Sequence, residues 1–260
     1  MEYQTKAIAG GRTEYFSLTR TATYSYLAAL PLFLAYEILI LVVNGGGTAQ
    51  IRVGADVWIK QAMSTIGAPG LFSIGLLVIL IGTGVYFAER KKNVPVYGRY
   101  FLLMIGESLL YAIVVAFIVS YIVGAIFAAG LVNVEAFTGT AMSAQASGPG
   151  KIEMLVLSIG AGLYEELVFR VLLVGGLYWG IKHLASEKVT AYLIAAVVGA
   201  AIFSAVHYIG PLGDVFELSS FFFRFLFGLA LNGLFLVRGF GVAAWTHALY
   251  DILVVSQILG

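Results

Sequence analysis

The hydrophobic positions of this chain form long runs that polar and charged positions interrupt at only a few points. A helix that crosses a bilayer needs about 20 consecutive, mostly apolar residues. Seven stretches approach or exceed this length, namely about 22–43, 70–88, 98–129, 152–181, 189–209, 220–237 and 240–258. The third and the fourth are longer than one crossing requires, so we expect them to tilt, to bend or to extend into water. The pattern predicts an all-α protein, a polytopic transmembrane helical bundle of about seven spans.

A further segment at 53–68 (VGADVWIKQAMSTIGA) mixes apolar and charged positions. We expect it to form an interfacial helix, and an eighth membrane segment is the alternative. The sequence contains no internal repeat and no sign of a second domain, so residues 1–260 are expected to form a single membrane domain.

The composition fits a membrane protein and excludes several kinds of site. Of the 260 residues, 60% are hydrophobic and 11% are charged, whereas soluble domains carry about 25% charged residues. The net charge of +1 gives no indication of nucleic acid as a partner. Because the chain has no cysteine, it has no disulfide, no thiolate metal site and no cysteine nucleophile.

Lys and Arg residues indicate the orientation of the chain, because cytoplasmic loops carry an excess of them. If the N-terminus is cytoplasmic, ten fall on the inner side and three on the outer side. The inner set is Lys6, Arg12, Arg20, Arg90, Lys91, Lys92, Arg99, Lys182, Lys188 and Arg238, and the outer set is Arg52, Lys60 and Lys151. The polar first 20 residues lack the apolar centre of a signal peptide and are expected to form a short cytoplasmic tail. We therefore predict an integral membrane protein with a cytoplasmic N-terminus. We expect its location to be the plasma membrane of a prokaryote.

Ionisable residues interrupt three of the predicted spans in the C-terminal half, although each costs about 2.5–3.5 kcal/mol at the centre of a bilayer helix. Residues four apart share a helix face, so Glu166 can pair with Arg170. Glu165 is rotated by about 100° from Glu166 and keeps a free carboxylate. The other two spans hold Phe203 with His207, and His247 with Asp251, each pair four apart.

These polar groups have a structural explanation and a functional one. The pair of Glu166 and Arg170 can simply hold a helix in the bundle, and the histidines and Asp251 can hydrogen-bond across helices. The combination of a carboxylate without a local partner, two histidines and another acid favours a site, because intramembrane ionisable residues are functional by default.

The residue types favour hydrolysis of an amide by an activated water. No serine stands in a G-x-S-x-G turn, which argues against a covalent acyl-enzyme. A buried carboxylate can act as a general base on water, and nearby histidines can orient the water or stabilise an oxyanion. The alternative is zinc held by Glu165 or Asp251 with His207 and His247, although the H-E-x-x-H motif is absent.

The three motifs, in their order on separate hydrophobic segments, resemble the CPBP family, which includes the type II CAAX prenyl endopeptidases and bacterial bacteriocin-processing and immunity proteins. The motifs are Glu165-Glu166-x-x-x-Arg170, Phe203-x-x-x-His207 and His247-x-x-x-Asp251. The resemblance covers about residues 150–258, the half expected to be catalytic. The first half matches only in being helical and hydrophobic.

The resemblance implies an intramembrane endopeptidase with a polar, water-accessible cavity inside the bundle. It implies membrane lipid and a peptide or lipid-anchored protein substrate as partners, and no required cofactor, with zinc as an open possibility. By resemblance Glu165 is the general base, His207 positions the water, and His247 with Asp251 stabilises the oxyanion. Glu166, Arg170 and Phe203 fall in supporting roles.

Asp251 departs from the pattern, because the prenyl-protease branch often has Asn at this position and an ionised carboxylate cannot donate to an oxyanion. Either Asp251 is protonated, or it orients His247 by accepting its N–H. The bacterial members frequently have Asp, which points away from a strict CAAX protease.

Depth in the membrane is a second difficulty. In the predicted topology His207 lies near the outer end of its helix and Glu165 nearer the middle of the bilayer, about 10 Å apart in depth at 1.5 Å per residue. A bend in the fifth helix, or a start later than residue 189, would close the gap. Glu37 and Glu107 are expected either to line the same cavity or to extend toward the interface.

Two other functions stay open at this point. The chain could be a non-catalytic membrane immunity or scaffold protein that keeps these residues for binding or stability. It could also be a proton-coupled transporter that uses them as a relay, although the absence of a repeat counts against this class.

Overall fold

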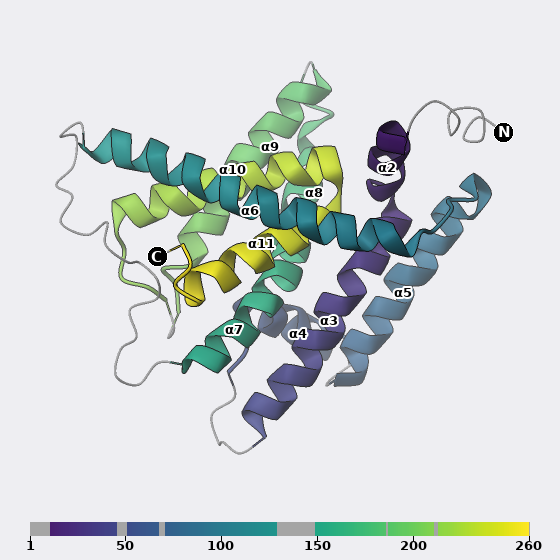
Figure 1. The fold of residues 1–260 in the computed structure, drawn as a ribbon, viewed down its shortest axis with the longest axis horizontal. Coiled ribbons are helices and arrows are strands. Elements are labelled where there is room, and N and C mark those ends of the chain that lie inside the picture. The colour runs from purple at the N-terminus through teal and green to yellow at the C-terminus, as the bar shows by residue number, and fades with distance from the viewer. Residues whose placement is uncertain are drawn as a thin grey trace.

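The computed structural model describes residues 11–45, 51–67, 71–128, 149–185, 187–210 and 213–259. These residues form helices joined by turns, and no strand occurs among them, so the predicted all-α fold is confirmed (Figure 1). The first half comprises α2 (Gly11–Thr19), α3 (Ala22–Asn44), α4 (Gly54–Thr65), α5 (Leu71–Glu89), the 3₁₀ turn η1 (Arg90–Lys92) and α6 (Gly98–Ile126). The second half comprises α7 (Lys151–Gly160), η3 (Ala161–Glu165), η4 (Leu167–Val174), α8 (Gly175–Ile181), α9 (Lys188–Val206), α10 (Leu218–Arg238) and α11 (Phe240–Val255).

Each of the seven predicted spans coincides with a helix or a continuous helical run. Within the described residues, α3, α6, α9 and α10 are long and apolar enough to cross a membrane, and α11 is a shorter apolar helix. The polytopic membrane bundle is therefore confirmed, and the number of spans stays a prediction. Helix α4 has 12 residues, or about 18 Å at 1.5 Å per residue, so it is too short to be the eighth crossing.

The long fourth span is helical throughout but not uniform. Between α7 and α8 the chain forms two π-helical segments, η3 and η4, which flank Glu166. π-helical turns inside α-helices are frequent at functional sites. The two adjacent glutamates therefore lie in a stretch of wider, less regular helix.

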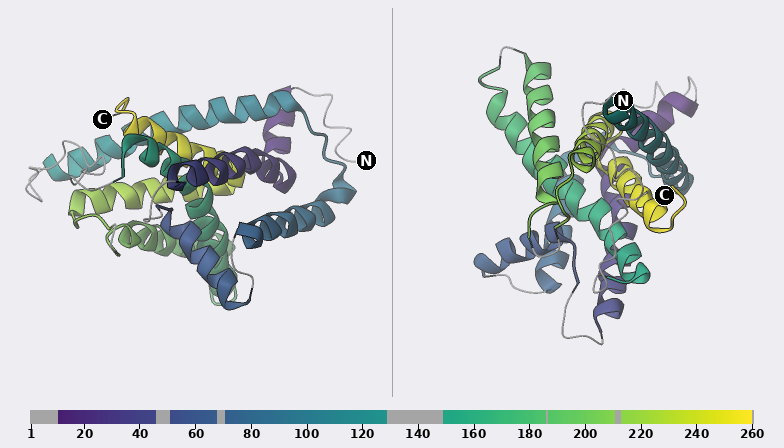
Figure 2. Two further views of the ribbon diagram at one scale, coloured as in Figure 1. Left: turned by 90° about the horizontal axis from the view of Figure 1, so that it is seen from below. Right: turned by 90° about the vertical axis from the view of Figure 1, so that its left-hand side faces the viewer.

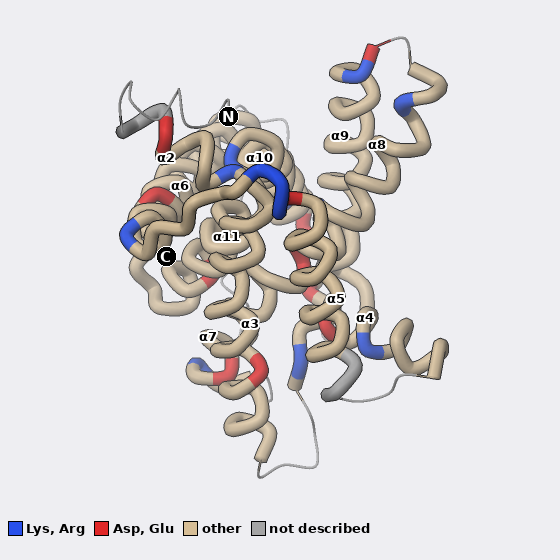
Figure 3. The backbone as a smooth tube through the Cα atoms, turned by 90° about the vertical axis from the view of Figure 1, so that its right-hand side faces the viewer, with Lys and Arg blue, Asp and Glu red and all other residues tan. Residues whose placement is uncertain are grey.

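Helices α8 and α9 form a hairpin that projects away from the remaining helices (Figure 2). Helix α9 packs along α8 and η4 and, further on, against α10. Most residues of the chain are uncharged, and charged residues lie at the tip of this hairpin, among other places (Figure 3). The hairpin brings the C-terminal end of α9 next to the middle of the fourth span.

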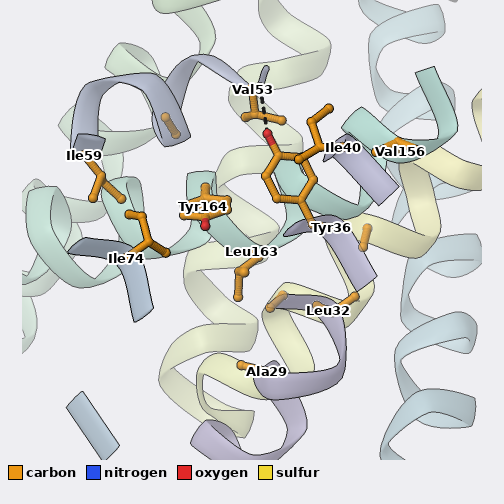
Figure 4. Packing of buried hydrophobic residues seen from close by; sticks show 13 residues of the cluster. Ala29, Leu32, Tyr36, Ile40, Val53, Ile59, Ile74, Val156, Leu163 and Tyr164 are labelled. Carbon is orange, nitrogen blue, oxygen red and sulfur yellow. Dashed lines mark hydrogen bonds between the residues drawn. The ribbon is translucent and has the colours of Figure 1, made fainter. Parts of the chain in front are cut away.

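Helix α11 lies at the centre of the molecule, where it packs against α3, α6, α7, η3 and α10. It begins directly after Gly239, whose φ of 85° allows the sharp reversal from α10. Residues of α3, α4, η3 and α11 together form the largest buried hydrophobic cluster (Figure 4). This cluster fixes η3 against α11.

The predicted cytoplasmic tail is partly a helix. Residues 1–10 lie outside the described part of the chain, and α2 packs against α3 and α6. The hydroxyl of Tyr15 donates to Glu107 at 2.7 Å, and Arg238 Nε lies 2.5 Å from the same carboxylate. Glu107 therefore joins α2, α6 and the end of α10, and the expectation that it lines a cavity with the candidate site is wrong.

Candidate active site

Glu166 and Arg170 form the predicted ion pair within the fourth span. Arg170 Nε lies 3.0 Å from Glu166 Oε2, and both side chains are buried. The second oxygen of Glu166 lies 2.8 Å from His247 Nδ1, a contact that the sequence did not predict. Because a carboxylate accepts and does not donate, Nδ1 of His247 carries the hydrogen. Glu166 thus connects Arg170 to the imidazole on α11.

Glu165 points away from this pair and toward both histidines. Its Oε2 atom lies 3.8 Å from His207 Nε2 and 4.0 Å from His247 Nε2. Within the described part of the chain this oxygen has no hydrogen-bond partner. The side chain is 16% exposed, whereas that of Glu166 is 0% exposed. The adjacent glutamates therefore have different surroundings, as their 100° separation predicts.

The tautomer of His207 follows from its backbone contact. His207 Nδ1 lies 2.7 Å from the carbonyl oxygen of Phe203, and a carbonyl only accepts, so Nδ1 carries the hydrogen. In the neutral ring Nε2 then presents a lone pair toward Glu165. Its side chain is 25% exposed.

Asp251 joins the same group from the next turn of α11. Its Oδ2 atom lies 3.5 Å from His247 Nε2, and its side chain is 27% exposed. Nε2 of His247 therefore faces two carboxylates, those of Glu165 and Asp251. The Asp251 carboxylate thus lies beside Nε2 of His247, and its role stays a prediction.

Phe203 packs between the parts of the site. Its ring centroid lies 4.9 Å from that of His207 and 5.9 Å from that of His247. The guanidinium carbon of Arg170 lies 4.5 Å from the same centroid, a cation–π geometry. Phe227 of α10 also contacts His247, at 5.8 Å between centroids. The sequence did not predict a role for Phe227, because a phenylalanine in an apolar helix gives no signal that it contacts a histidine.

The expected difference in depth between His207 and Glu165 is absent. From Glu165 to Ile181 the chain advances 181 − 165 = 16 residues, and from Lys188 to His207 it advances 207 − 188 = 19 residues. The two arms of the α8–α9 hairpin are therefore similar in length, and His207 returns to the level of Glu165. Neither a later start nor a bend of α9 is needed, because α9 begins at Lys188 and runs without a break to Val206.

Gly162 allows η3 to approach α11 closely. A Cβ atom at residue 162 would lie 2.5 Å from the backbone nitrogen of Ala248 and 2.6 Å from the carbonyl oxygen of Ala244. Because backbone atoms cannot move aside individually, any larger residue at this position forces the two segments apart. The contact between Glu166 and His247 depends on this approach.

We predict that Gly162→Ala destabilises the protein by about 1–3 kcal/mol, the usual range for overpacking. The measurement is thermal unfolding in detergent. Gly176→Ala in α8 is the matched control, since a Cβ atom there meets nothing within 4 Å and alanine favours helix over glycine. An unchanged melting temperature for Gly162→Ala would contradict the close packing.

Zinc was the alternative use of Glu165, His207 and His247. The described residues contain no group of three or more His, Asp or Glu side chains arranged to hold a metal ion. At 3.8 and 4.0 Å the carboxylate oxygen and each imidazole nitrogen are too far apart for a direct hydrogen bond, but one water beside them can contact both atoms.

Comparison with known proteins covers the part of the chain that builds this site. Residues 149–253 match the family described as type II CAAX prenyl endopeptidase Rce1-like. Searches among curated proteins and among solved structures found no match. The matched range contains all three motifs and agrees with the range of about 150–258 that the resemblance covered. Through residues 149–253 the chain is similar to the Rce1-like family of type II CAAX prenyl endopeptidases, and this similarity supports a membrane protease.

Proposed function

We propose that the protein hydrolyses a peptide bond of a membrane-associated substrate with a water molecule activated by Glu165. One observation carries this proposal: the free carboxylate oxygen of Glu165 faces Nε2 of both histidines at 3.8 and 4.0 Å. The partial exposure of His207 and Asp251 beside Glu165 supports access for water and substrate.

The first step is attack of water on the scissile carbonyl. Glu165 takes one proton from the water, and the hydroxide oxygen forms a bond to the carbonyl carbon. The lone pair on Nε2 of His207 accepts a hydrogen bond from the second O–H of the same water and orients it. The tautomer that Phe203 imposes on His207 suits this role.

The second step is stabilisation and collapse of the tetrahedral intermediate. A hydrogen on Nε2 of His247 donates to the oxyanion, and the carboxylates of Glu166 and Asp251 balance the charge of the imidazolium. Arg170 neutralises Glu166 in turn, at 3.0 Å. As the C–N bond breaks, the protonated Glu165 returns its proton to the leaving amine.

The substrate proposed is a peptide or a lipid-anchored protein, presented from the surrounding lipid. The description of the family names prenylated CAAX ends, which supports this class. The prokaryotic plasma membrane stays a prediction, and the cytoplasmic N-terminus stays a prediction from the Lys and Arg distribution. The competing proposal is a non-catalytic immunity or scaffold protein, and no specific contact favours it.

A reconstituted assay tests the proposal. Purified protein in liposomes is incubated with a farnesylated, internally quenched peptide that ends in Cys-aliphatic-aliphatic-X, and products are identified by mass spectrometry. We expect cleavage after the prenylated cysteine, and the same rate after treatment with a zinc chelator. An intact peptide would contradict a prenylated CAAX end as the substrate, and activity lost on chelation and restored by zinc would support the metal alternative.

A further inference from the structure

Glu165 is held between two neighbours that are each fixed by other side chains. On one side Glu166 contacts Arg170 and His247 at 3.0 and 2.8 Å. On the other side the buried hydroxyl of Tyr164 donates to Glu37 Oε1 at 2.5 Å. Glu165 itself has a buried oxygen without a hydrogen-bond partner in the described part of the chain. Its position therefore depends on what holds residues 164 and 166.

Glu37 belongs to a second group of charged residues, which lies apart from the candidate active site. Lys60 Nζ lies 3.3 Å from Glu37, and Arg52 lies 3.9 Å from it. The same two cations contact Asp56, at 2.6 Å from Lys60 and 2.9 Å from Arg52. Two cations and two carboxylates thus neutralise one another around α3 and α4. We call Glu37, Arg52, Asp56 and Lys60 the α4 network.

The hydroxyl of Tyr36 binds to the α4 network, whereas that of Tyr164 extends from η3. The Tyr36 hydroxyl donates to Asp56 at 3.0 Å. It accepts from the backbone N–H of Val53 at 3.2 Å, the bond drawn in Figure 4. The rings of Tyr36 and Tyr164 pack edge to face with centroids 5.4 Å apart. The two tyrosines are therefore similar in burial and surroundings, and only the hydroxyl of Tyr164 belongs to the segment that carries Glu165.

The π-helical backbone of η3 makes the hydrogen bond from Tyr164 to Glu37 important for the position of Glu165. Tyr164 and Glu165 lie in the π-helical segment η3, where the regular hydrogen bonds of an α-helix are interrupted. A carboxylate that acts as a general base must be held closely, since a misplacement of about 1 Å can cost about 100-fold in rate. Contacts from neighbouring residues can supply this precision in addition to the backbone.

We propose that Tyr164 is a positioning residue for Glu165, and that its hydrogen bond to Glu37 fixes the catalytic turn to α3 and the α4 network. This inference rests on the proposed function of Glu165. It gives the α4 network two roles, which are to join α4 to α3 and to help align the active site. Loss of the Tyr164 hydroxyl lowers kcat and leaves KM unchanged, because the hydroxyl contacts no substrate.

The test compares Tyr164→Phe with Tyr36→Phe in the liposome assay with the farnesylated peptide. Each variant loses one buried hydroxyl and keeps its ring, so similar decreases in melting temperature are expected. Tyr164→Phe is expected to lower kcat by about 10- to 100-fold at constant KM. Tyr36→Phe keeps the hydrogen bond between Tyr164 and Glu37 and is expected to lower kcat much less. Equal kcat values for the two variants would overturn the inference.

Glu37 gives a second test that does not depend on the folding of Tyr164→Phe. Glu37→Gln keeps an oxygen that can accept from Tyr164, whereas Glu37→Leu removes it. We expect Glu37→Gln to retain more of the original kcat than Glu37→Leu does, and Glu37→Leu to add little to the effect of Tyr164→Phe, because both remove the same hydrogen bond. Equal kcat for the two Glu37 variants, or additive effects, would overturn the inference.

Glu165→Gln separates failure of this inference from failure of the proposed function. If Glu165→Gln is inactive and Tyr164→Phe has the original kcat, only the positioning role is wrong. If Glu165→Gln retains full activity, the proposed function of Glu165 is itself wrong, and the positioning role falls with it.

Discussion

Glu165→Gln is expected to abolish peptide cleavage and to leave the fold intact. The amide of glutamine cannot take a proton from water, and general-base catalysis contributes about 100- to 10,000-fold. Because the oxygen concerned makes no hydrogen bond in the described part of the chain, the substitution removes no hydrogen bond that stabilises the protein. The measurement is kcat on the farnesylated peptide in liposomes, together with the melting temperature in detergent.

The control for this prediction is another glutamate that loses its charge outside the site. Glu187 precedes α9 at the exposed tip of the hairpin, so Glu187→Gln is expected to change neither kcat nor melting temperature. If Glu165→Gln cleaves the peptide as fast as Glu187→Gln, then Glu165 is not the base. A large loss of melting temperature in Glu165→Gln would instead identify a structural role.

The sequence predicts the helices and the contacts within single helices well, because both follow from local rules. Spans of apolar residues must form helices in lipid, where the backbone has no other partner. Spacing along one helix predicted the pairing of Glu166 with Arg170 and the separate direction of Glu165, and both are present. The packing of Phe203 beside His207 followed from the same rule.

Contacts between helices could not be predicted in the same way, because they depend on how helices far apart in sequence are placed. The contact of Glu166 with His247 joins residues 81 positions apart, and the contact of Tyr164 with Glu37 joins residues 127 positions apart. Asp56 did carry a signal, since Arg52 and Lys60 stand four residues before and after it. That spacing predicts a charged cluster on α4, but not its connection to Glu165.

The predicted difference in depth between His207 and Glu165 was wrong, and the lengths of the segments in the sequence explain why. The inference placed Glu165 and His207 by their distance from the ends of separate spans. It did not consider that residues 165–181 and 188–207 are two arms of one hairpin with similar lengths. Two antiparallel arms of equal length bring their far ends to the same level, whatever the thickness of the bilayer.

Arg170→Met is expected to destabilise the protein by about 3–5 kcal/mol, the range for removing one partner of a buried ion pair. Glu166 would remain buried, with the contact to His247 and without its cation. The measurement is the free energy of unfolding in detergent. The control is Lys92→Met, because Lys92 is 49% exposed in its pair with Glu89, and an exposed pair contributes at most about 1 kcal/mol.

The double variant Glu166→Gln with Arg170→Met separates stability from chemistry. Removing both charges leaves no unpaired ion, so the double variant is expected to be more stable than Arg170→Met alone. Its activity is expected to stay low, because His247 loses the carboxylate at 2.8 Å that balances a protonated ring in the proposed mechanism. Recovery of both stability and kcat would mean that Glu166 only neutralises Arg170. Recovery of stability alone would make Glu166 the link between the buried ion pair and the histidine that donates to the oxyanion.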